Sequence, residues 1–212
     1  MAQEIKRGPD SSTAPSPPAK MTYEEFLDWI DDETHAEWVD GEVIFMSPVS
    51  SKHQDIGGFL MPLIRHFAEA HDSGIVRYDP FQMKTGPDLP GRAPDILFLA
   101  KENLSRLKKT HLDGPADLVI EIISPESRTR DKEEKFYEYE QGGVREYWLI
   151  DPLRKQAEFY QLGEDRIYHL ALVDEDGTYH SRVMEGLWLK VDWLWQEPLP
   201  PLLNVLKEWG LV

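Results

Sequence analysis

Two acidic residues interrupt apolar segments near the middle of this chain. Asp95 follows Pro94 and precedes the run Ile-Leu-Phe-Leu, and Glu121 lies inside the run Leu-Val-Ile-Glu-Ile-Ile that begins at Leu118. Burying an isolated carboxylate is costly unless it is paired with a cation or binds a metal ion. Each of these acids therefore needs a partner, and the two together could hold a divalent cation if their segments are neighbouring strands.

Such a pair of carboxylates suits one kind of chemistry. A magnesium-type ion takes oxygen ligands and keeps several waters, and it can activate water and neutralise charge on a phosphate. A nearby lysine would position the nucleophile or stabilise the transition state. The pattern therefore suits a metal-assisted reaction at a phosphate. A purely structural interpretation stays open, with Asp95 as a turn residue and Glu121 as half of a buried ion pair.

The elements around these acids can be predicted from the sequence. We expect strands over 96–99 and 118–123, followed by a helix over 126–142 that ends at Gly142-Gly143. On that helix Asp131, Lys135 and Tyr139 are spaced i, i+4 and i+8, so they share one face. This spacing favours a stripe of residues facing the site, or equally an ordinary surface salt bridge.

The remaining segments alternate between helical and strand patterns. Thr22 and Glu25 form a capping box at a helix start, and Asp40-Gly41 is a strong hairpin signal. The order predicts a mixed α/β fold in which helices flank a central mixed sheet. The further expected segments are a hairpin over 36–46, a helix over 50–70, a strand over 75–83, a turn-rich loop over 85–93, a short helix over 101–107, a buried strand over 147–150, strands over 156–162, 166–173 and 178–191, and a closing helix over 198–209.

Length and composition describe an ordinary globular chain. With 212 residues, 41% of them hydrophobic, we expect a single domain over 21–212, preceded by a disordered leader over 1–20 that is rich in Pro, Ser and charge. The absence of cysteine excludes disulfides and thiolate metal sites. No apolar run is long enough to cross a bilayer, and no signal peptide is evident. These features predict a cytoplasmic protein with no membrane partner.

The net charge of −16 bears directly on the choice of partner. Nucleic-acid binding rests on neutralising phosphates, so a nucleic-acid enzyme should carry basic residues. A nuclease interpretation must therefore concentrate basic residues near the site or use metal ions to bridge acids and phosphate. Arg128, Arg130 and Lys132 form a local basic patch just after Ser124-Pro125 that could contact phosphates.

The chain resembles a known family over most of its length. Asp95, Glu121 and the following helix are similar to the PD-(D/E)xK nuclease pattern, and residues 21–205 resemble the Uma2 (Uma-two) family of restriction endonucleases. The stretches that carry the resemblance are Thr22-Tyr-Glu-Glu-Phe, Glu37-Trp-Val-Asp-Gly-Glu42, Ser47-Pro, Ser51-Lys-His53, Pro94-Asp95, Leu118-Val-Ile-Glu121-Ile-Ile-Ser-Pro125, Arg130-Asp131 with Lys135 and Tyr139, Gly143-Val-Arg-Glu-Tyr-Trp-Leu-Ile-Asp-Pro152 and Gly186-Leu-Trp-Leu.

The resemblance implies a restriction-endonuclease-like core that hydrolyses DNA with magnesium or manganese. It implies that Asp95 and Glu121 are catalytic and bind the metal together with the backbone carbonyl of Ile122. The lysine expected two residues after the glutamate is Ile123 here, and Lys135 is the matching position on the next helix. Glu42, which follows the hairpin turn, is a further candidate metal ligand; Glu37, which precedes the turn, could approach the metal equally well, and both could also be exposed hairpin charges.

Several alternatives stay open from the sequence. The unusual lysine position and the acidity are also typical of a nuclease-fold protein that binds or assembles without cutting. RNA could replace DNA as the substrate, and a homodimer would suit the cutting of two strands. His53, at the start of a predicted helix, could contact phosphate or support the site, although a capping or core role is the more common one.

Overall fold

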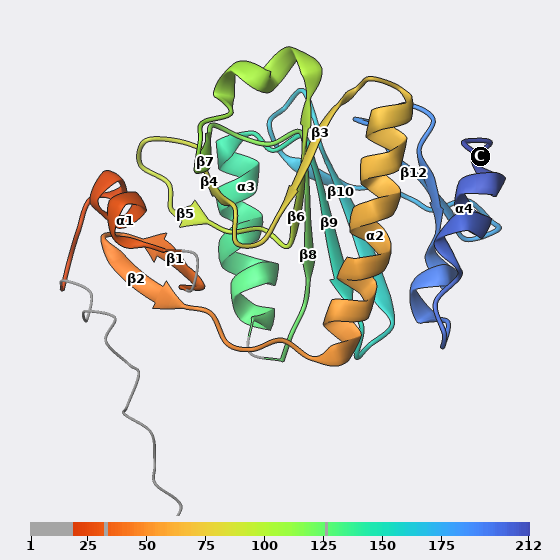
Figure 1. The fold of residues 1–212 in the computed structure, drawn as a ribbon, viewed down its shortest axis with the longest axis horizontal. Helices are drawn as coiled ribbons and strands as arrows, with labels where there is room; N and C mark the ends of the chain where they lie inside the picture. The colour runs from red at the N-terminus through yellow and green to blue at the C-terminus, as the bar shows by residue number, and fades with distance from the viewer. Residues whose placement is uncertain (1–18, 32–33, 126) are drawn as a thin grey trace, which may run out of the picture.

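A six-stranded mixed sheet forms the centre of the protein (Figure 1). The computed structural model describes residues 19–31, 34–125 and 127–212, so residues 1–18 of the predicted leader lie outside the described part. Strands β8 and β9 are parallel, and the other neighbouring pairs are antiparallel. In spatial order the strands are β11 (Tyr168–Leu170), β10 (Gln156–Leu162), β9 (Glu146–Asp151), β8 (Leu118–Ile122), β6 (Ile96–Ala100) and β3 (Gly74–Tyr78).

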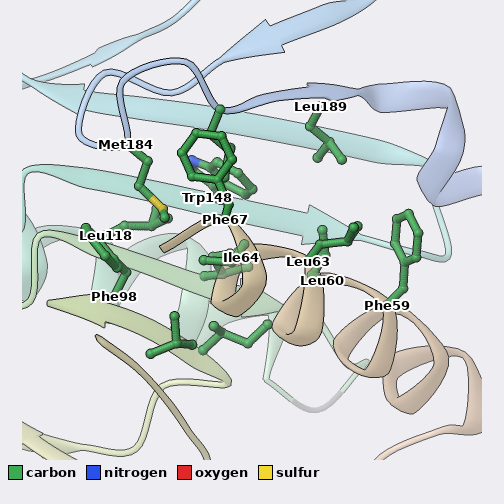
Figure 2. Packing of buried hydrophobic residues seen from close by; sticks show 14 of the residues in the cluster. Phe59, Leu60, Leu63, Ile64, Phe67, Phe98, Leu118, Trp148, Met184 and Leu189 are labelled. Carbon is green, nitrogen blue, oxygen red and sulfur yellow. The ribbon is translucent and has the colours of Figure 1, made fainter. Parts of the chain in front are cut away.

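Helix α2 (Ser51–Ala70) covers one face of this sheet. Alternate residues of a strand point to opposite faces, so Leu118, Ile120 and Ile122 of β8 all join the core beneath this helix. Figure 2 shows Leu60, Leu63 and Ile64 of α2 packed in the same layer as Trp148. Each fully buried side chain of this size contributes about 1.5–3 kcal/mol through the hydrophobic effect. The predicted helix over 50–70 is confirmed, and Ser50 caps it.

Helix α3 (Lys135–Gly142) covers the opposite face and carries Lys135 and Tyr139 of the predicted stripe, while Asp131 lies in the turn before it. It follows a π-helical turn over Arg130–Glu134, a distortion that is frequent at functional sites. Gly143, at φ 89°, ends it, because its N–H donates to the carbonyls of Tyr139 and Glu140. The predicted helix over 126–142 is therefore present in its later part, and Glu126 lies outside the described residues.

A second, five-stranded sheet lies beside the first and brings the amino-terminal hairpin to the site. Its turn has positive φ at both Asp40 (51°) and Gly41 (90°), as a two-residue hairpin requires. Thr22 and Glu25 form the predicted capping box of α1 (Tyr23–Trp29). The spatial order of the sheet is β2 (Glu42–Phe45), β1 (Ala36–Val39), β5 (Gly91–Arg92), β4 (Gln82–Lys84) and β7 (His111–Asp113).

Several predicted boundaries differ from the structure. The strand expected over 75–83 is two strands, β3 and β4, because the chain turns at Asp79-Pro80 and enters the second sheet. Strand β5 lies within the expected loop over 85–93, and β7 was not predicted. The strand expected over 178–191 is a two-stranded hairpin of β12 (Thr178–His180) and β13 (Trp188–Lys190).

The carboxy-terminal part completes the core around α2. A short 3-10 helix over Lys101–Arg106 confirms the predicted one, and another follows over Val191–Trp195. Helix α4 (Leu202–Glu208) packs beside α2, as Figure 1 shows. Trp193 is buried in the core cluster, and Trp188 and Trp195 pack against it. Within the described residues, no helix combines the length and apolarity needed to cross a membrane.

Candidate active site

The sheet register brings Asp95 and Glu121 opposite each other. Strands β6 and β8 are antiparallel with Ile96 paired to Ile120. Asp95 lies one residue before Ile96 and Glu121 one residue after Ile120, so continuing the register places the two acids across from one another. Both line one pocket of about 570 Å³ at this end of the sheet. The sequence expectation of two acids on neighbouring strands therefore corresponds to the geometry.

Asp95 is held by two donors that act on the same oxygen. Its Oδ2 accepts a hydrogen bond from the backbone N–H of Ile122 at 2.6 Å and lies 3.1 Å from Nε2 of His53. The carboxyl group is thereby tied to the strand that carries Glu121. His53 is buried near the start of α2, and burial opposes its charge while the bond to Asp95 raises its pKa. His53 thus contacts a site carboxylate rather than capping the helix.

Lys135 reaches the site from α3. Its Nζ lies 2.8 Å from Oε1 of Glu121, and the hydroxyl of Tyr139 donates to the same oxygen at 2.8 Å. The side chains of Lys135 and Glu121 are only 1% and 4% exposed, so the pair is shielded from water. The lysine can reach back because α3 packs directly over this face of the sheet. Ile123, at the ordinary lysine position of the motif, is buried among apolar residues on the same face.

Glu37 is the second carboxylate that binds Lys135. Its Oε1 lies 3.0 Å from the lysine Nζ, and its Oε2 accepts from Nη1 of Arg92 at 2.9 Å. Arg92 in turn holds Glu138 with two hydrogen bonds, at 2.8 Å and 2.7 Å. Burial would raise the pKa of Glu37, but the positive charges of Lys135 and Arg92 lower it to about 2. The role of Arg92 was not predicted, because its segment has the composition of a loop.

Asp131 completes the ring of acids around Lys135. Its Oδ1 lies 3.6 Å from the lysine Nζ and 3.9 Å from Nε of Arg130. The predicted stripe of Asp131, Lys135 and Tyr139 therefore faces the sheet, and it is not a surface salt bridge. All three side chains are buried.

The pKa values of Glu121 and Lys135 are both raised in this cluster. Burial raises the pKa of Glu121, and the nearby carboxylates of Asp131 and Asp95 raise it further, while Lys135 opposes them. Burial alone would lower the pKa of Lys135, but the carboxylates of Glu121, Glu37 and Asp131 raise it well above its usual range. The lysine is therefore a fixed cation at neutral pH, and the site holds an excess of acidic groups over it.

Other predicted residues lie away from this cluster. Glu42 does not reach the pocket: it directly follows the hairpin turn on β2 and is exposed, whereas Glu37 on the partner strand is buried at the site. Arg128 is paired with Asp151 at 2.5 Å, and Lys132 with Glu158 at 3.2 Å. Of the predicted basic patch, only Arg130 lines the pocket.

The donor set can be compared with the needs of a divalent cation. Within the described residues, no three His, Asp or Glu side chains are grouped so as to hold a metal by themselves. Asp95 and Glu121 supply two carboxylates, and Ile122, whose carbonyl is the further candidate ligand, also lines the pocket. Two carboxylates with waters suit magnesium or manganese, which prefer oxygen ligands and retain part of their hydration. The residues present therefore fit such an ion.

Comparisons with known proteins agree with this fold. The solved structure of a putative nuclease belonging to DUF820 from Anabaena variabilis matches with a TM-score of 0.67 at 20% identity, covering 82% of this chain and 97% of that one. At this identity the likeness shows the fold, which is of the restriction-endonuclease-like type. No curated protein matches the sequence. The sequence model of Uma2, described as "Putative restriction endonuclease", matches residues 23–192, and the chain belongs to this family.

Proposed function

We propose that this protein is a metal-dependent endonuclease that hydrolyses phosphodiester bonds of DNA. The observation that carries the proposal is the meeting of Asp95 and Glu121 on adjacent strands at one pocket, with Lys135 Nζ 2.8 Å from Glu121. Carboxylates and a lysine are residue types that suit metal-dependent phosphodiester hydrolysis. The family supports the same class of reaction.

The side chains of the site would have two roles, binding the metal ion and placing a positive charge beside the phosphate. Asp95 and Glu121 would hold magnesium or manganese, together with the carbonyl of Ile122, and the ion when bound supplies an activated water and neutralises phosphate charge. Within the described part of the chain, the side-chain hydrogen bonds from Lys135 and Tyr139 both go to Oε1 of Glu121, so Oε2 could bind a cation. Lys135 keeps a positive charge beside the reacting phosphate, and its three carboxylate neighbours fix its position.

A cleavage assay tests this proposal. The full chain, incubated with Mg²⁺ or Mn²⁺, should cut duplex or single-stranded DNA, and Glu121→Ala should lose at least about 100-fold in rate with its fold retained. Glu158→Ala is a matched control, because Glu158 lies on β10 outside the pocket, paired with Lys132. Cleavage that persists in a folded Glu121→Ala protein would contradict the proposal. An RNA probe in the same panel separates DNA from RNA as the substrate.

A second candidate is a nuclease-fold module that binds or assembles without cutting. Its specific support is the full engagement of Lys135 by three carboxylates, together with Ile123 at the usual lysine position and the net charge of −16. A wild-type protein that binds nucleic acid but no divalent ion would favour it.

Sedimentation of the full chain would test the homodimer that cutting two strands suggests.

A further inference from the structure

The pocket that holds the acids also has an apolar side with no part in the proposed hydrolysis. Its residues come from the segment between β2 and α2, from the first half of α2 and from the end of β3. Several of them are exposed, including Val49, at 41%, and Tyr78, at 50%. The members of this apolar side are Met46, Pro48, Val49, Gly57, Gly58, Met61 and Tyr78.

Two consecutive glycines form part of this side. Gly57 and Gly58 lie inside the 20-residue helix α2, where glycine weakens a helix relative to alanine. A Cβ at Gly57 would make an ordinary contact at 3.5 Å with Ile122, and a Cβ at Gly58 would meet nothing within 4 Å. No neighbour in the described chain therefore requires glycine at position 58. The bare helix backbone keeps open a space that a side chain would fill.

The aromatic ring of Tyr78 belongs to a residue that lines the same pocket. Tyr78 is the last residue of the edge strand β3, and the guanidinium of Arg65 lies 5.9 Å from its ring centroid. Half-exposed aromatic rings and arginine planes are the groups on which unstacked bases are held in single-strand binding sites. The combination places a stacking surface beside the carboxylates.

The two permanent cations of the pocket lie close to carboxylates. Lys135 is bound by Glu37 and Glu121, and Nε of Arg130 lies 3.9 Å from both Glu37 and Asp131 but has no hydrogen-bond partner among the described residues. A protein that follows the backbone of a duplex needs several free lysines or arginines for its phosphates. When no metal ion is bound, few charges of this pocket remain for phosphates, so contact with a base should supply most of the affinity.

We propose that this pocket holds a single unpaired nucleotide of a DNA strand, with its base against Tyr78 and the Gly57-Gly58 backbone and its phosphate toward Asp95 and Glu121. The volume of about 570 Å³ lies within the range of about 300–1,000 Å³ typical of small-ligand pockets. The inference rests on the proposed function, since it names the substrate form that the same site prefers. The preferred substrate is then single-stranded DNA or a duplex with an extruded nucleotide.

Binding of three labelled DNA probes tests the preference. The probes are a 12-nucleotide single strand, a fully paired duplex, and the same duplex with one extra unpaired nucleotide. Binding is measured by fluorescence anisotropy with the Glu121→Gln protein, which should not cleave the probes. Both probes with an unpaired nucleotide should bind at least about ten-fold more tightly than the paired duplex. For the single strand, the slope of log K against log salt should be no steeper than about −1.4, which corresponds to two phosphates.

Two substitutions in the same background test the pocket itself. Gly58→Leu should weaken binding of the unpaired probes at least about ten-fold while leaving the melting temperature equal or higher, because leucine favours the helix. Glu69→Leu is the control, since it adds the same side chain at an exposed position of α2 outside the pocket. Tyr78→Ala should weaken binding about 5- to 150-fold, the range for loss of one stacking contact.

The outcomes separate this inference from the proposed nuclease activity. If Gly58→Leu binds the unpaired probes as tightly as its parent, or the paired duplex binds best with a steep salt dependence, the nucleotide pocket is wrong even when the wild type cleaves DNA. If the two substitutions weaken binding of the unpaired probes as expected but the wild type cleaves no probe with Mg²⁺ or Mn²⁺, the pocket stands and the proposed activity fails.

Discussion

The ammonium nitrogen of Lys135 lies 2.8 Å from Oε1 of Glu121, although the two residues belong to different elements and are 14 positions apart. In the PD-(D/E)xK pattern that the chain resembles, the lysine lies two residues after the glutamate. This chain has the buried Ile123 at that position. A lysine from α3 thus delivers its charge to the same carboxylate from the layer above the sheet. We therefore propose that Lys135 supplies the positive charge that the motif lysine would give, from a different position in the sequence.

Replacing Lys135 should damage both stability and activity. In Lys135→Met the carboxylates of Glu37, Glu121 and Asp131 lose their shared cation, so the free energy of unfolding should fall by about 3–5 kcal/mol at pH 8. The loss should be smaller at pH 5, where Glu121 and Asp131, whose pKa values are raised mainly by burial, take up protons more readily. Denaturant unfolding at both pH values measures this.

Lys132→Met is the matched control for Lys135. Lys132 lies three residues earlier and forms a partly exposed pair with Glu158, which contributes little to stability. The change should alter the free energy of unfolding by less than about 0.5 kcal/mol. Equal losses in the two variants would show that the buried cluster does not depend on Lys135.

The two acids stand out in the sequence because each is a charged residue at or inside an apolar run, whereas Lys135 is singled out by the family resemblance. Asp95 directly precedes the apolar strand β6, Glu121 lies inside the otherwise apolar strand β8, and Lys135 has the spacing to share a helix face with Asp131 and Tyr139. Hydrophobic periodicity likewise predicted α2, the first hairpin and most strands of the central sheet. Such signals are local, so they are visible without the fold.

The contributions of Glu37 and Arg92 depend on distant pairings that a local pattern does not carry. Glu37 reaches Lys135 only because β1 joins the second sheet, and Arg92 lies in a two-residue strand within a segment of loop composition. Glu42 has the same residue type and a similar place in the hairpin as Glu37, yet it is exposed. Which of two hairpin acids becomes buried is decided by tertiary packing.

Two glutamate-to-glutamine changes in the cluster should have opposite effects. Glu37→Gln removes the carboxylate shared by Lys135 and Arg92 and should lower the free energy of unfolding by about 3–5 kcal/mol at pH 7. Glu121→Gln keeps an acceptor for Lys135 and Tyr139 and removes a charge that burial disfavours. It should raise the free energy of unfolding by about 1 kcal/mol at pH 8. Losses of similar size in both variants would contradict this account.

The two glutamates should also differ in their pH dependence. The pKa of Glu37 falls from 4.5 to about 2 in the fold, so its stabilisation is complete above pH 4.5 and is lost as pH falls from 4.5 to 2. The pKa of Glu121 is raised above 4.5 by burial, so its ionised form destabilises the fold increasingly as pH rises above that value. The advantage of Glu121→Gln should therefore shrink toward pH 4.5, as denaturant titrations from pH 4 to 8 would measure.

His53 should act on metal binding through Asp95. Nε2 of His53 lies 3.1 Å from Oδ2 of Asp95, so His53→Ala should weaken binding of Mn²⁺ about 10- to 100-fold with little change in fold. His66→Ala is the control, because His66 is exposed on the same helix and, among the residues that the structure describes, bonds the carbonyl of Pro62. An unchanged metal affinity in a folded His53→Ala protein would show that His53 does not position Asp95.

The most direct test of the central claim is a calorimetric titration of the full chain with Mn²⁺, comparing wild type with Asp95→Asn and Glu121→Gln. The wild type should bind a divalent ion, and each variant should keep its fold and lose at least about 10-fold in affinity, because each removes one of the two carboxylate ligands. A wild type that binds no Mn²⁺ even with a DNA fragment present, or variants that bind as tightly as wild type, would contradict a metal site at Asp95 and Glu121.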